Sequence, residues 1–250
     1  MSTPTPTRRT FPMLLAALLA LSVGMPADAA PRPERARVSA RAARAATHAQ
    51  RRLGATLKAK GLAFGDEIYL RAFKEEALLE LWMRRGERFE LVRTYPVCAA
   101  SGGLGPKLRV GDEQVPEGFY RVGAGAMNPA SNYHLSFNVG YPNAFDRSLG
   151  RTGGLIMIHG DCVSIGCLAM TDAGIEEIYT LADAAHRAGQ RSFAVDIFPF
   201  RMTAENLKRH GTSKWKGFWQ NLRQGHDAFE ARRVPPKVTS RDGRYVFSRD

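Results

Sequence analysis

The sequence predicts a mostly β domain that contains one central helix and carries helical segments at both ends. Three observations lead to this fold class. Short apolar runs with partial alternation follow one another from residue 67 to residue 159, and charged or glycine-containing turns separate several of them, which is typical of consecutive strands. Apolar residues recur at helical spacing after residue 171. The segments before residue 61 and after residue 202 lack strand-like alternation.

The folded part begins near Leu62 and opens with strands. Three apolar runs, separated by Lys-Glu-Glu and Arg-Gly-Glu, predict strands at Glu67–Phe73, Ala77–Arg84 and Arg88–Val97. The next stretch, SGGLGPKLRVGDEQVPEGFYRV, has glycine or proline at nearly every bend, so it predicts a long loop that leads into a hairpin at Gly118–Gly123. Further strands are expected at Tyr133–Val139 and Gly154–His159.

The central helix is predicted from its cap, its apolar face and its stop signal. Thr171 can cap a helix over Ala173–Ala188, and Gly189 ends it. A strand follows at Ser192–Pro199. The tail Thr203–Glu230 is expected to be helical, with an aromatic stripe that is typical of core packing: Trp215, Phe218, Trp219 and Leu222. These elements predict a folded domain over residues 62–200 and a C-terminal helical extension over 201–250.

The N-terminus has the features of a secretory signal peptide over residues 1–29. Arg8 and Arg9 precede the apolar run FPMLLAALLALSV, and small residues offer a cleavage site. The run is too short to favour a membrane span, so we expect a periplasmic protein, exported by the Sec or the twin-arginine route, with no integral span once the signal is removed; a retained anchor is the alternative. Residues 30–61 are rich in Ala and Arg and offer no face to bury, which predicts a basic stalk or a solvated helix.

The formal net charge of +12 indicates an anionic neighbourhood. Export argues against nucleic acid as the partner, and no pattern of a nucleic-acid-binding module is present. An anionic polymer of the cell envelope fits better. Basic residues that only solvate the surface would give the same excess, so this alternative stays open.

The stretch IHGDCVSIGCLAM brings His159, Cys162 and Cys167 close together. Cys167 is expected just ahead of a helix, where free backbone N–H groups and the helix dipole lower the pKa of a thiol. An imidazole such as His159 can shuttle the proton of such a nucleophile. Gly166 lets the backbone approach a substrate carbonyl, so nearby amides can form an oxyanion hole. The pattern predicts a cysteine acyl-transfer site.

Two other uses of these cysteines compete with catalysis. A structural zinc would need a fourth ligand and usually a tighter cysteine pair, and only Cys98 and His134 could add to the set, so we expect no metal. A disulfide between Cys162 and Cys167 is a further alternative, because an exported protein folds in an oxidising compartment. Three cysteines are too few for a disulfide scaffold, and the odd number indicates one free thiol.

The motif His159-Gly160 followed by Ser164-Ile165-Gly166-Cys167 resembles the signature of the L,D-transpeptidase catalytic-domain family. The upstream segments 95–97, 101–107 and 116–120 are similar to strand and hairpin elements of that family. Segments 134–138 (HLSFN) and 140–143 (GYPN) resemble the murein L,D-transpeptidase branch, which includes the amidase that detaches murein lipoprotein from diaminopimelate. The resemblance runs from about Glu67 to Pro199.

This resemblance implies a β-sandwich-like catalytic fold and a reaction on peptidoglycan stem peptides through a thioester. The nucleophile corresponds to Cys167 and its base to His159, while Ser164, Ile165 and Gly166 form the turn that shapes the oxyanion hole. No metal or organic cofactor is implied. Cys98 and Cys162 stand where this branch also carries cysteine, so a disulfide between them would leave Cys167 free; two inert thiols are the alternative.

The chain departs from the family pattern at two positions near the nucleophile. Ile165 replaces a second histidine, and Ala169 replaces an arginine that holds a substrate carboxylate. Another basic side chain must take over that role, and the candidates are Arg147, Arg151 and Lys107.

Transfer and hydrolysis share the acyl-enzyme and differ in whether an amine or water resolves it. The sequence thus leaves open a transpeptidase, an amidase that releases a wall-anchored lipoprotein, and a non-catalytic murein-binding module. The module is the least favoured of the three, because both His159 and Cys167 are present.

Overall fold

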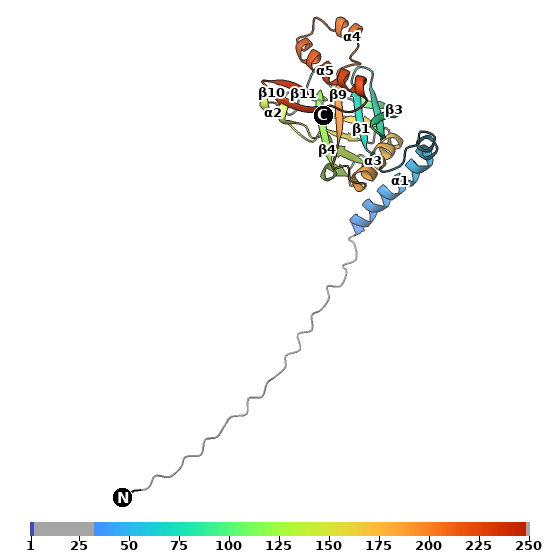
Figure 1. The fold of residues 1–250 in the computed structure, drawn as a ribbon, viewed down its shortest axis with the longest axis vertical. Helices are drawn as coiled ribbons and strands as arrows, with labels where there is room; N and C mark the ends of the chain where they lie inside the picture. The colour runs from blue at the N-terminus through green and yellow to red at the C-terminus, as the bar shows by residue number, and fades with distance from the viewer. Residues whose placement is uncertain (3–32, 249–250) are drawn as a thin grey trace. The chain divides into compact units, whose positions relative to one another are not determined.

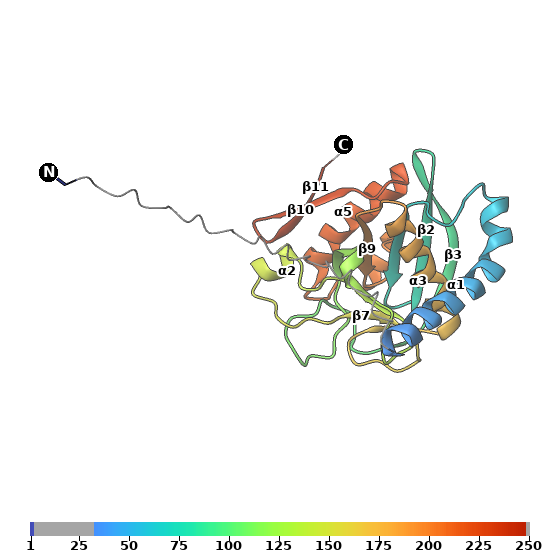
Figure 2. The same cartoon turned by 90° about the horizontal axis from the view of Figure 1, so that it is seen from below.

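A computed structural model describes residues 1–2 and 33–248 (Figures 1 and 2). The predicted signal peptide lies almost wholly outside the described residues. The helices of the described part are α1 (Pro33–Ala59), α2 (Ala144–Ser148), α3 (Asp172–Arg187), α4 (Ala204–Arg209) and α5 (Lys216–Arg232). None of them combines the length and the apolar character that crossing a membrane requires.

The described residues form one large sheet in which the strands run in the order β4-β9-β1-β2-β3-β8-β7-β6-β5. Its strands are β1 (Ile68–Phe73), β2 (Leu78–Arg85), β3 (Arg88–Ala100), β4 (Gly118–Gly123), β5 (Met127–Asn128), β6 (Ser136–Asn138), β7 (Met157–His159), β8 (Leu168–Met170) and β9 (Ser192–Phe198). Neighbouring strands pair antiparallel, except that β1 with β9 and β7 with β8 are parallel. The mostly β fold class is confirmed.

The sheet curves so that its two ends face each other across a common core. Phe137 on β6 and Phe193 on β9 have ring centroids 5.6 Å apart, although five strands separate β6 from β9 in the sheet order. The apolar face of α3 closes this core, with Ile175, Ile178 and Leu181 fully buried. Thr171 caps α3 by accepting a hydrogen bond from the Gly174 amide. A sandwich-like arrangement thus arises from one nearly closed sheet.

Residues 33–59 form a helix, one of the two alternatives expected for residues 30–61, but this helix packs on the domain and is not simply solvated. They form α1, which lies along α3 in Figures 1 and 2 and buries Ala45, Ala49, Leu53 and Leu57 at helical spacing. The high content of arginine hides this narrow stripe, and alanine at two of its positions lets the two helices approach closely. Arg52 adds ion pairs to Glu176 and Glu177 of α3.

The C-terminal region departs from the predicted helical extension over 201–250. It contains α4 and α5, but it ends in a hairpin of β10 (Lys237–Arg241) and β11 (Arg244–Ser248) that pairs antiparallel. The two turn residues, Asp242 and Gly243, have φ values of 50° and 67°. Asp-Gly with two positive φ angles is the favoured two-residue hairpin turn, so the signal was present in the sequence but not used.

Asp196 on β9 is a buried carboxyl in the face of the sheet that α5 and the hairpin cover. It is 3% exposed and accepts a hydrogen bond of 2.5 Å from the Tyr69 hydroxyl. Burial raises the pKa of Asp196 to about 7, although Tyr69 and the charges of Arg71 and Arg121 favour its ionised form. The folded protein therefore holds this proton more tightly than the unfolded chain, where the pKa is near 4.

A stability measurement can detect this proton. Because the folded pKa is raised, the contribution of Asp196 to stability is lost as the pH rises from about 4 to about 7. Asp196→Asn removes the ionisation, so we expect it to raise the free energy of unfolding by about 2–3 kcal/mol more at pH 8 than at pH 5. Urea unfolding at both pH values measures this. Asp183→Asn, at a partly exposed ion pair with Arg187, is the control; an equal effect of Asp196→Asn at both pH values would contradict the assignment.

Candidate active site

The parallel pairing of β7 with β8 brings His159 and Cys167 together. Ile158 lies opposite Leu168 and His159 opposite Ala169, so Cys167 takes the position beside Met157. The Met157 amide donates to the Cys167 sulfur at 3.4 Å. Positions 157, 159, 167 and 169 share one face of the strand pair, because side chains alternate along a strand. The thiol and the imidazole therefore lie on the same face of two adjacent strands, two register positions apart.

The ring of His159 is oriented by a hydrogen bond through Nδ1. It is 3% exposed, and its Nδ1 lies 2.6 Å from the Gly160 carbonyl oxygen. A carbonyl only accepts, so Nδ1 carries the proton and Nε2 is left as the basic nitrogen. The Tyr133 ring packs against the imidazole with centroids 4.9 Å apart. This geometry suits His159 to accept a proton through Nε2.

The environment of Cys167 differs from the predicted one. The thiol does not precede a helix directly, because β8 and Thr171 separate it from α3. Burial raises the pKa of Cys167 above its ordinary value near 9, while the Met157 amide and the charge of Lys107 oppose the rise. The thiol is thus protonated at neutral pH. It requires a base, and it receives no direct activation from a helix N-terminus.

The turn before Cys167 is fixed by two serine hydroxyls. Ser164 Oγ accepts from the Cys167 amide at 3.0 Å and donates to the Cys167 carbonyl at 2.7 Å. The Gly166 amide donates to Ser101 Oγ, and Gly166 has a φ of +87°, which favours glycine. Two amides of this turn, those of Gly166 and Cys167, therefore already donate to hydroxyls, and an acyl oxygen that used either of them would have to displace Ser101 or Ser164. The Ile165 side chain points out and is 78% exposed.

The cysteines divide into one bonded pair and one free thiol. Cys98 at the end of β3 forms a disulfide with Cys162, and Cys167 stays free. A bond between Cys162 and Cys167 is therefore absent, and the zinc alternative loses two of its ligands. Among the residues that the structure describes, no group of three or more His, Cys, Asp or Glu side chains could hold a metal ion.

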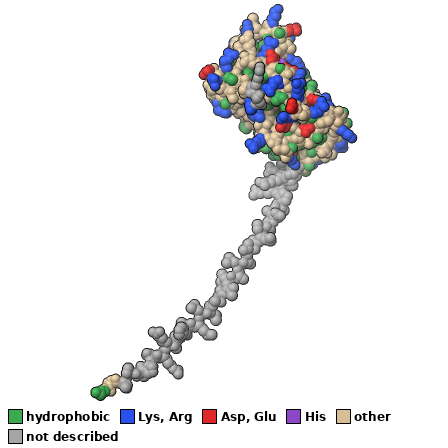
Figure 3. All heavy atoms as spheres, in the orientation of Figure 1, with side chains coloured by type: hydrophobic (Ala, Val, Ile, Leu, Met, Phe, Trp, Pro, Cys, Tyr) green, Lys and Arg blue, Asp and Glu red, His purple; other side chains and the backbone are tan. Residues whose placement is uncertain are grey.

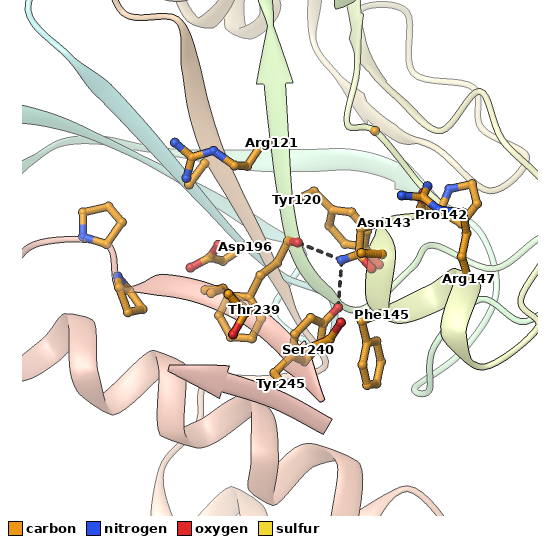
Figure 4. Close-up of a pocket in the computed structure, with 17 residues that line it drawn as sticks. Tyr120, Arg121, Pro142, Asn143, Phe145, Arg147, Asp196, Thr239, Ser240 and Tyr245 are labelled. Carbon is orange, nitrogen blue, oxygen red and sulfur yellow. Dashed lines mark hydrogen bonds between the residues drawn. The ribbon is translucent and has the colours of Figure 1, made fainter. Parts of the chain in front are cut away.

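The three basic candidates for substrate binding have different surroundings. Lys107 is 5% exposed and ion-paired with Asp112 at 2.5 Å, and it is close enough to act on the Cys167 thiol. Arg151 is buried in an ion pair of 2.8 Å with Asp146, so its role is structural. Arg147 is exposed, donates to the Pro142 carbonyl and lines a separate cavity (Figure 4). Only Lys107 among them has an electrostatic effect on the thiol.

Exposed apolar side chains occur on the segments that carry the thiol and the imidazole. Leu155, whose carbonyl lies 3.8 Å from the Cys167 sulfur, is 78% exposed, and Val163 in the motif loop is 51% exposed. Tyr133, beside His159, is 46% exposed. Such side chains suit contact with a substrate better than with water.

Helix α1 supports the loop that carries Tyr133, a connection that sequence reasoning missed. Arg41 on α1 donates to the carbonyls of Ser131 and His134 at 2.8 and 2.7 Å. His134 has a φ of +62° and bonds Glu176 of α3 at 3.1 Å. The Tyr133 carbonyl in turn accepts from the Gly160 amide. The N-terminal helix thus fixes the loop that packs against the imidazole.

The assignment of the disulfide predicts a thiol count. We expect one reactive thiol in the denatured, unreduced protein and three after reduction, since Cys98 and Cys162 are bonded. Ellman titration in guanidinium chloride measures both numbers. Cys167→Ser should lower each count by one. Three thiols before reduction would show that the bond is absent.

The role of α1 predicts a distant effect on the imidazole. Arg41→Ala should shift the pH dependence of Cys167 alkylation by iodoacetamide and slow the reaction several-fold, because the 131–134 loop loses two hydrogen bonds that charge strengthens. Arg44→Ala, an exposed arginine on the same helix, is the matched control and should leave the profile unchanged. If Arg41→Ala and Arg44→Ala gave the same pH profile of alkylation, the hydrogen bonds from α1 would have no influence on His159.

The chain is similar to known proteins over most of its length. The family model of the YkuD L,D-transpeptidase catalytic domain matches residues 68–226. The chain is 50% identical over 185 residues to the protein named "Putative L,D-transpeptidase YafK" of Escherichia coli strain K12, covering 74% of this chain and 75% of that protein. The protein of the same name from Escherichia coli O157:H7 matches equally.

Two solved structures also match over most of the chain. The helical cell shape determining protein Pgp2 of Campylobacter jejuni aligns with a TM-score of 0.43 and 19% identity, over 78% of this chain and 82% of that one. Bd1075 of Bdellovibrio bacteriovorus aligns with a TM-score of 0.39 and 17% identity, over 71% and 78%.

Proposed function

The chain belongs to the L,D-transpeptidase catalytic domain family, and we propose that it modifies peptidoglycan stem peptides in the periplasm by cysteine acyl transfer. The observation that carries this proposal is the placement of a free thiol and an oriented imidazole on one face of the β7–β8 pair. Family membership itself supports a role in modifying peptidoglycan. The mechanism, the compartment and the assignment of each residue are the proposal.

The proposed reaction starts from a protonated thiol. The Cys167 sulfur attacks a carbonyl carbon of a stem peptide while its proton moves to Nε2 of His159. Charge develops on the carbonyl oxygen, and amides of the turn at Ser164, Ile165 and Gly166 are the expected donors once a serine hydroxyl is displaced. The tetrahedral intermediate collapses to a thioester, and the leaving amine takes the proton from His159. A second amine or a water then resolves the thioester by the reverse steps.

The raised pKa of Cys167 supports a reaction in which the base acts during attack. A buried thiol with little thiolate at rest is a poor nucleophile until its proton is removed. Lys107 opposes the rise, so its charge would also stabilise the thiolate as it forms. Hydrogen bonding of Nδ1 to Gly160 keeps the basic nitrogen fixed. No metal or organic cofactor has a part in these steps.

Charge and apolar surface support a wall-bound substrate. Basic side chains are spread over the visible face of the folded part in Figure 3, which favours attraction to an anionic polymer. The exposed Leu155, whose carbonyl lies 3.8 Å from the Cys167 sulfur, and Val163 of the motif loop offer contacts to the alkyl groups of a peptide.

Hydrolysis is the second candidate. Cys167 stands only eight positions after His159, and the thiol is partly exposed, so water could reach a thioester. In that case the protein would be an amidase that releases a wall-anchored lipoprotein from diaminopimelate. A non-catalytic murein-binding module is the third, and the preserved thiol and base weigh against it.

The proposal predicts the loss of activity at two residues. Cys167→Ser and His159→Ala should each reduce turnover of purified sacculi to below about 1% of the unmodified protein, since general-base and nucleophilic steps each contribute factors of 10²–10⁴. His210→Ala, which removes an imidazole that stacks on Phe200 away from the site, is the control and should stay active. Mass analysis of the released muropeptides measures turnover.

The same products decide between the candidates. New cross-links between stem peptides, or newly attached protein, would establish transfer. Released protein or lost cross-links without either product would establish hydrolysis. If the wild-type protein binds sacculi but leaves the muropeptides unchanged, the non-catalytic murein-binding module is the remaining candidate. Full activity of Cys167→Ser would remove this thiol from the mechanism.

A further inference from the structure

The disulfide between Cys98 and Cys162 lies in the loop that joins the imidazole to the thiol. Cys162 is the third residue after His159 and the fifth before Cys167, and its partner Cys98 is near the end of β3. Both bonded cysteines are exposed. External thiols reach and reduce exposed disulfides, whereas the structural disulfides of exported proteins resist reduction. This bond is therefore open to thiol exchange while the protein is folded.

The disulfide helps to hold an unusual backbone conformation. Asp161 has a φ of +61°, and its carbonyl accepts from the Val163 amide at 2.7 Å, so the chain makes a three-residue turn centred on Cys162. A residue other than glycine keeps a left-handed conformation when the surrounding contacts fix it. Asp172 provides one such contact, by accepting from the Asp161 amide at 2.9 Å, and the disulfide provides a second. Cleavage of the disulfide therefore allows this turn to relax.

The disulfide and a hydrogen bond link the motif loop, residues 160–166, to the end of β3. The hydrogen bond runs from the Gly166 amide to the Ser101 hydroxyl. Ser101 lies three residues after Cys98, and Gly166 lies four residues after Cys162, so both links join the same pair of segments. An acyl oxygen that binds the Gly166 amide displaces the Ser101 hydroxyl. The disulfide then still ties the turn to β3.

The nucleophile and the base are positioned by other contacts. His159 ends β7 and Cys167 directly precedes β8, and the parallel pairing of these two strands sets their relative position. The Met157 amide also donates to the Cys167 sulfur. Opening of the disulfide should therefore disturb the amides of the turn more than the thiol or the imidazole.

From these contacts we propose that the Cys98–Cys162 bond is a redox site that controls acylation of Cys167. A dithiol cleaves it: one thiolate attacks a sulfur of the bond, and the displaced cysteine leaves as a thiolate and takes up a proton. The second thiol of the dithiol then closes its own disulfide and releases the other cysteine. Two electrons and two protons pass from the dithiol to the protein. The inference rests on the proposed function, because acylation of Cys167 is the step that the bond controls.

Two reactions of Cys167 separate the turn from the thiol. Iodoacetamide alkylates the sulfur without forming an oxyanion, whereas p-nitrophenyl acetate acylates it through one. The full chain is reduced with dithiothreitol, the reductant is removed by gel filtration, and both reactions are followed by mass analysis of the Cys167 peptide. Reduction should slow acylation at least about tenfold and change alkylation less than about twofold, since losing one oxyanion donor costs about 10²–10³ in rate. Reoxidation with oxidised glutathione should restore acylation.

The double variant Cys98→Ser/Cys162→Ser is the matched control, because it lacks the bond in either redox condition. Its Cys167 should be acylated at the slow rate of the reduced protein, with or without prior dithiothreitol. The reversible change in the wild-type protein tests the inference independently of how well this variant folds.

Four results would overturn the inference: a disulfide that dithiothreitol leaves intact in the folded protein, equal acylation in both redox states, equal loss of alkylation and acylation on reduction, or acylation of the double variant at the rate of the oxidised protein. Alkylation of Cys167 without any acylation in the oxidised protein would refute acyl transfer, and the redox control with it. Equal acylation in both redox states would refute the redox control alone.

Discussion

The parallel pairing of β7 with β8 is the constraint on which the candidate site depends. The pairing is only a few residues long, yet it sets Cys167 beside Met157 and His159 opposite Ala169. Parallel strands require a crossover connection, and here that connection is the loop that carries Gly160 to Gly166. The disulfide between Cys98 and Cys162 ties this loop to β3, the neighbour of β8 on its other side. The same motif thus supplies the base, the nucleophile and the bond that holds the turn between them.

The electrostatics of the site follow from that geometry. Because β8 separates Cys167 from α3, the thiol is desolvated without the compensating field of a helix N-terminus, and its pKa rises. The one charge that opposes this rise is on Lys107, and Lys107 is itself paired with Asp112. Although burial opposes it, hydrogen bonding from Lys107 and backbone amides holds the pKa of Asp112 at about 2. The Asp112 carboxyl is therefore ionised at neutral pH and stays paired with Lys107, and the thiol depends mainly on the imidazole.

Sequence reasoning located what local pattern determines and missed what tertiary contacts determine. Strand positions followed from alternation, and Thr171 was identified as the cap of α3 because capping is local. The stretch Leu168–Met170 was assigned to no element, since three apolar residues have no period of their own. Cys167 was therefore expected just ahead of the helix, and the pKa expectation for its thiol was wrong. Helix α1 buries its narrow apolar face against α3, and Arg151 pairs with Asp146 of α2. Both contacts join segments that local sequence pattern does not connect, so neither was predicted. The hairpin turn Asp242-Gly243 was visible and was not used.

One segment connects the candidate site with the separate cavity that Arg147 lines. The chain from Val139 to Met157 lines the cavity at its start and reaches the thiol at its end, where the Met157 amide meets the sulfur. Its two ends are joined by the hydrogen bond from the Val139 amide to the Ile156 carbonyl, and the Tyr141 hydroxyl lies 3.2 Å from both the Lys107 and the Thr152 carbonyls. The buried pair of Arg151 and Asp146 fixes its middle. Since these contacts hold the segment at both ends and in its middle, the Cys167 sulfur has a fixed position on the β7–β8 face, which is the condition that favours attack on one carbonyl over its neighbours.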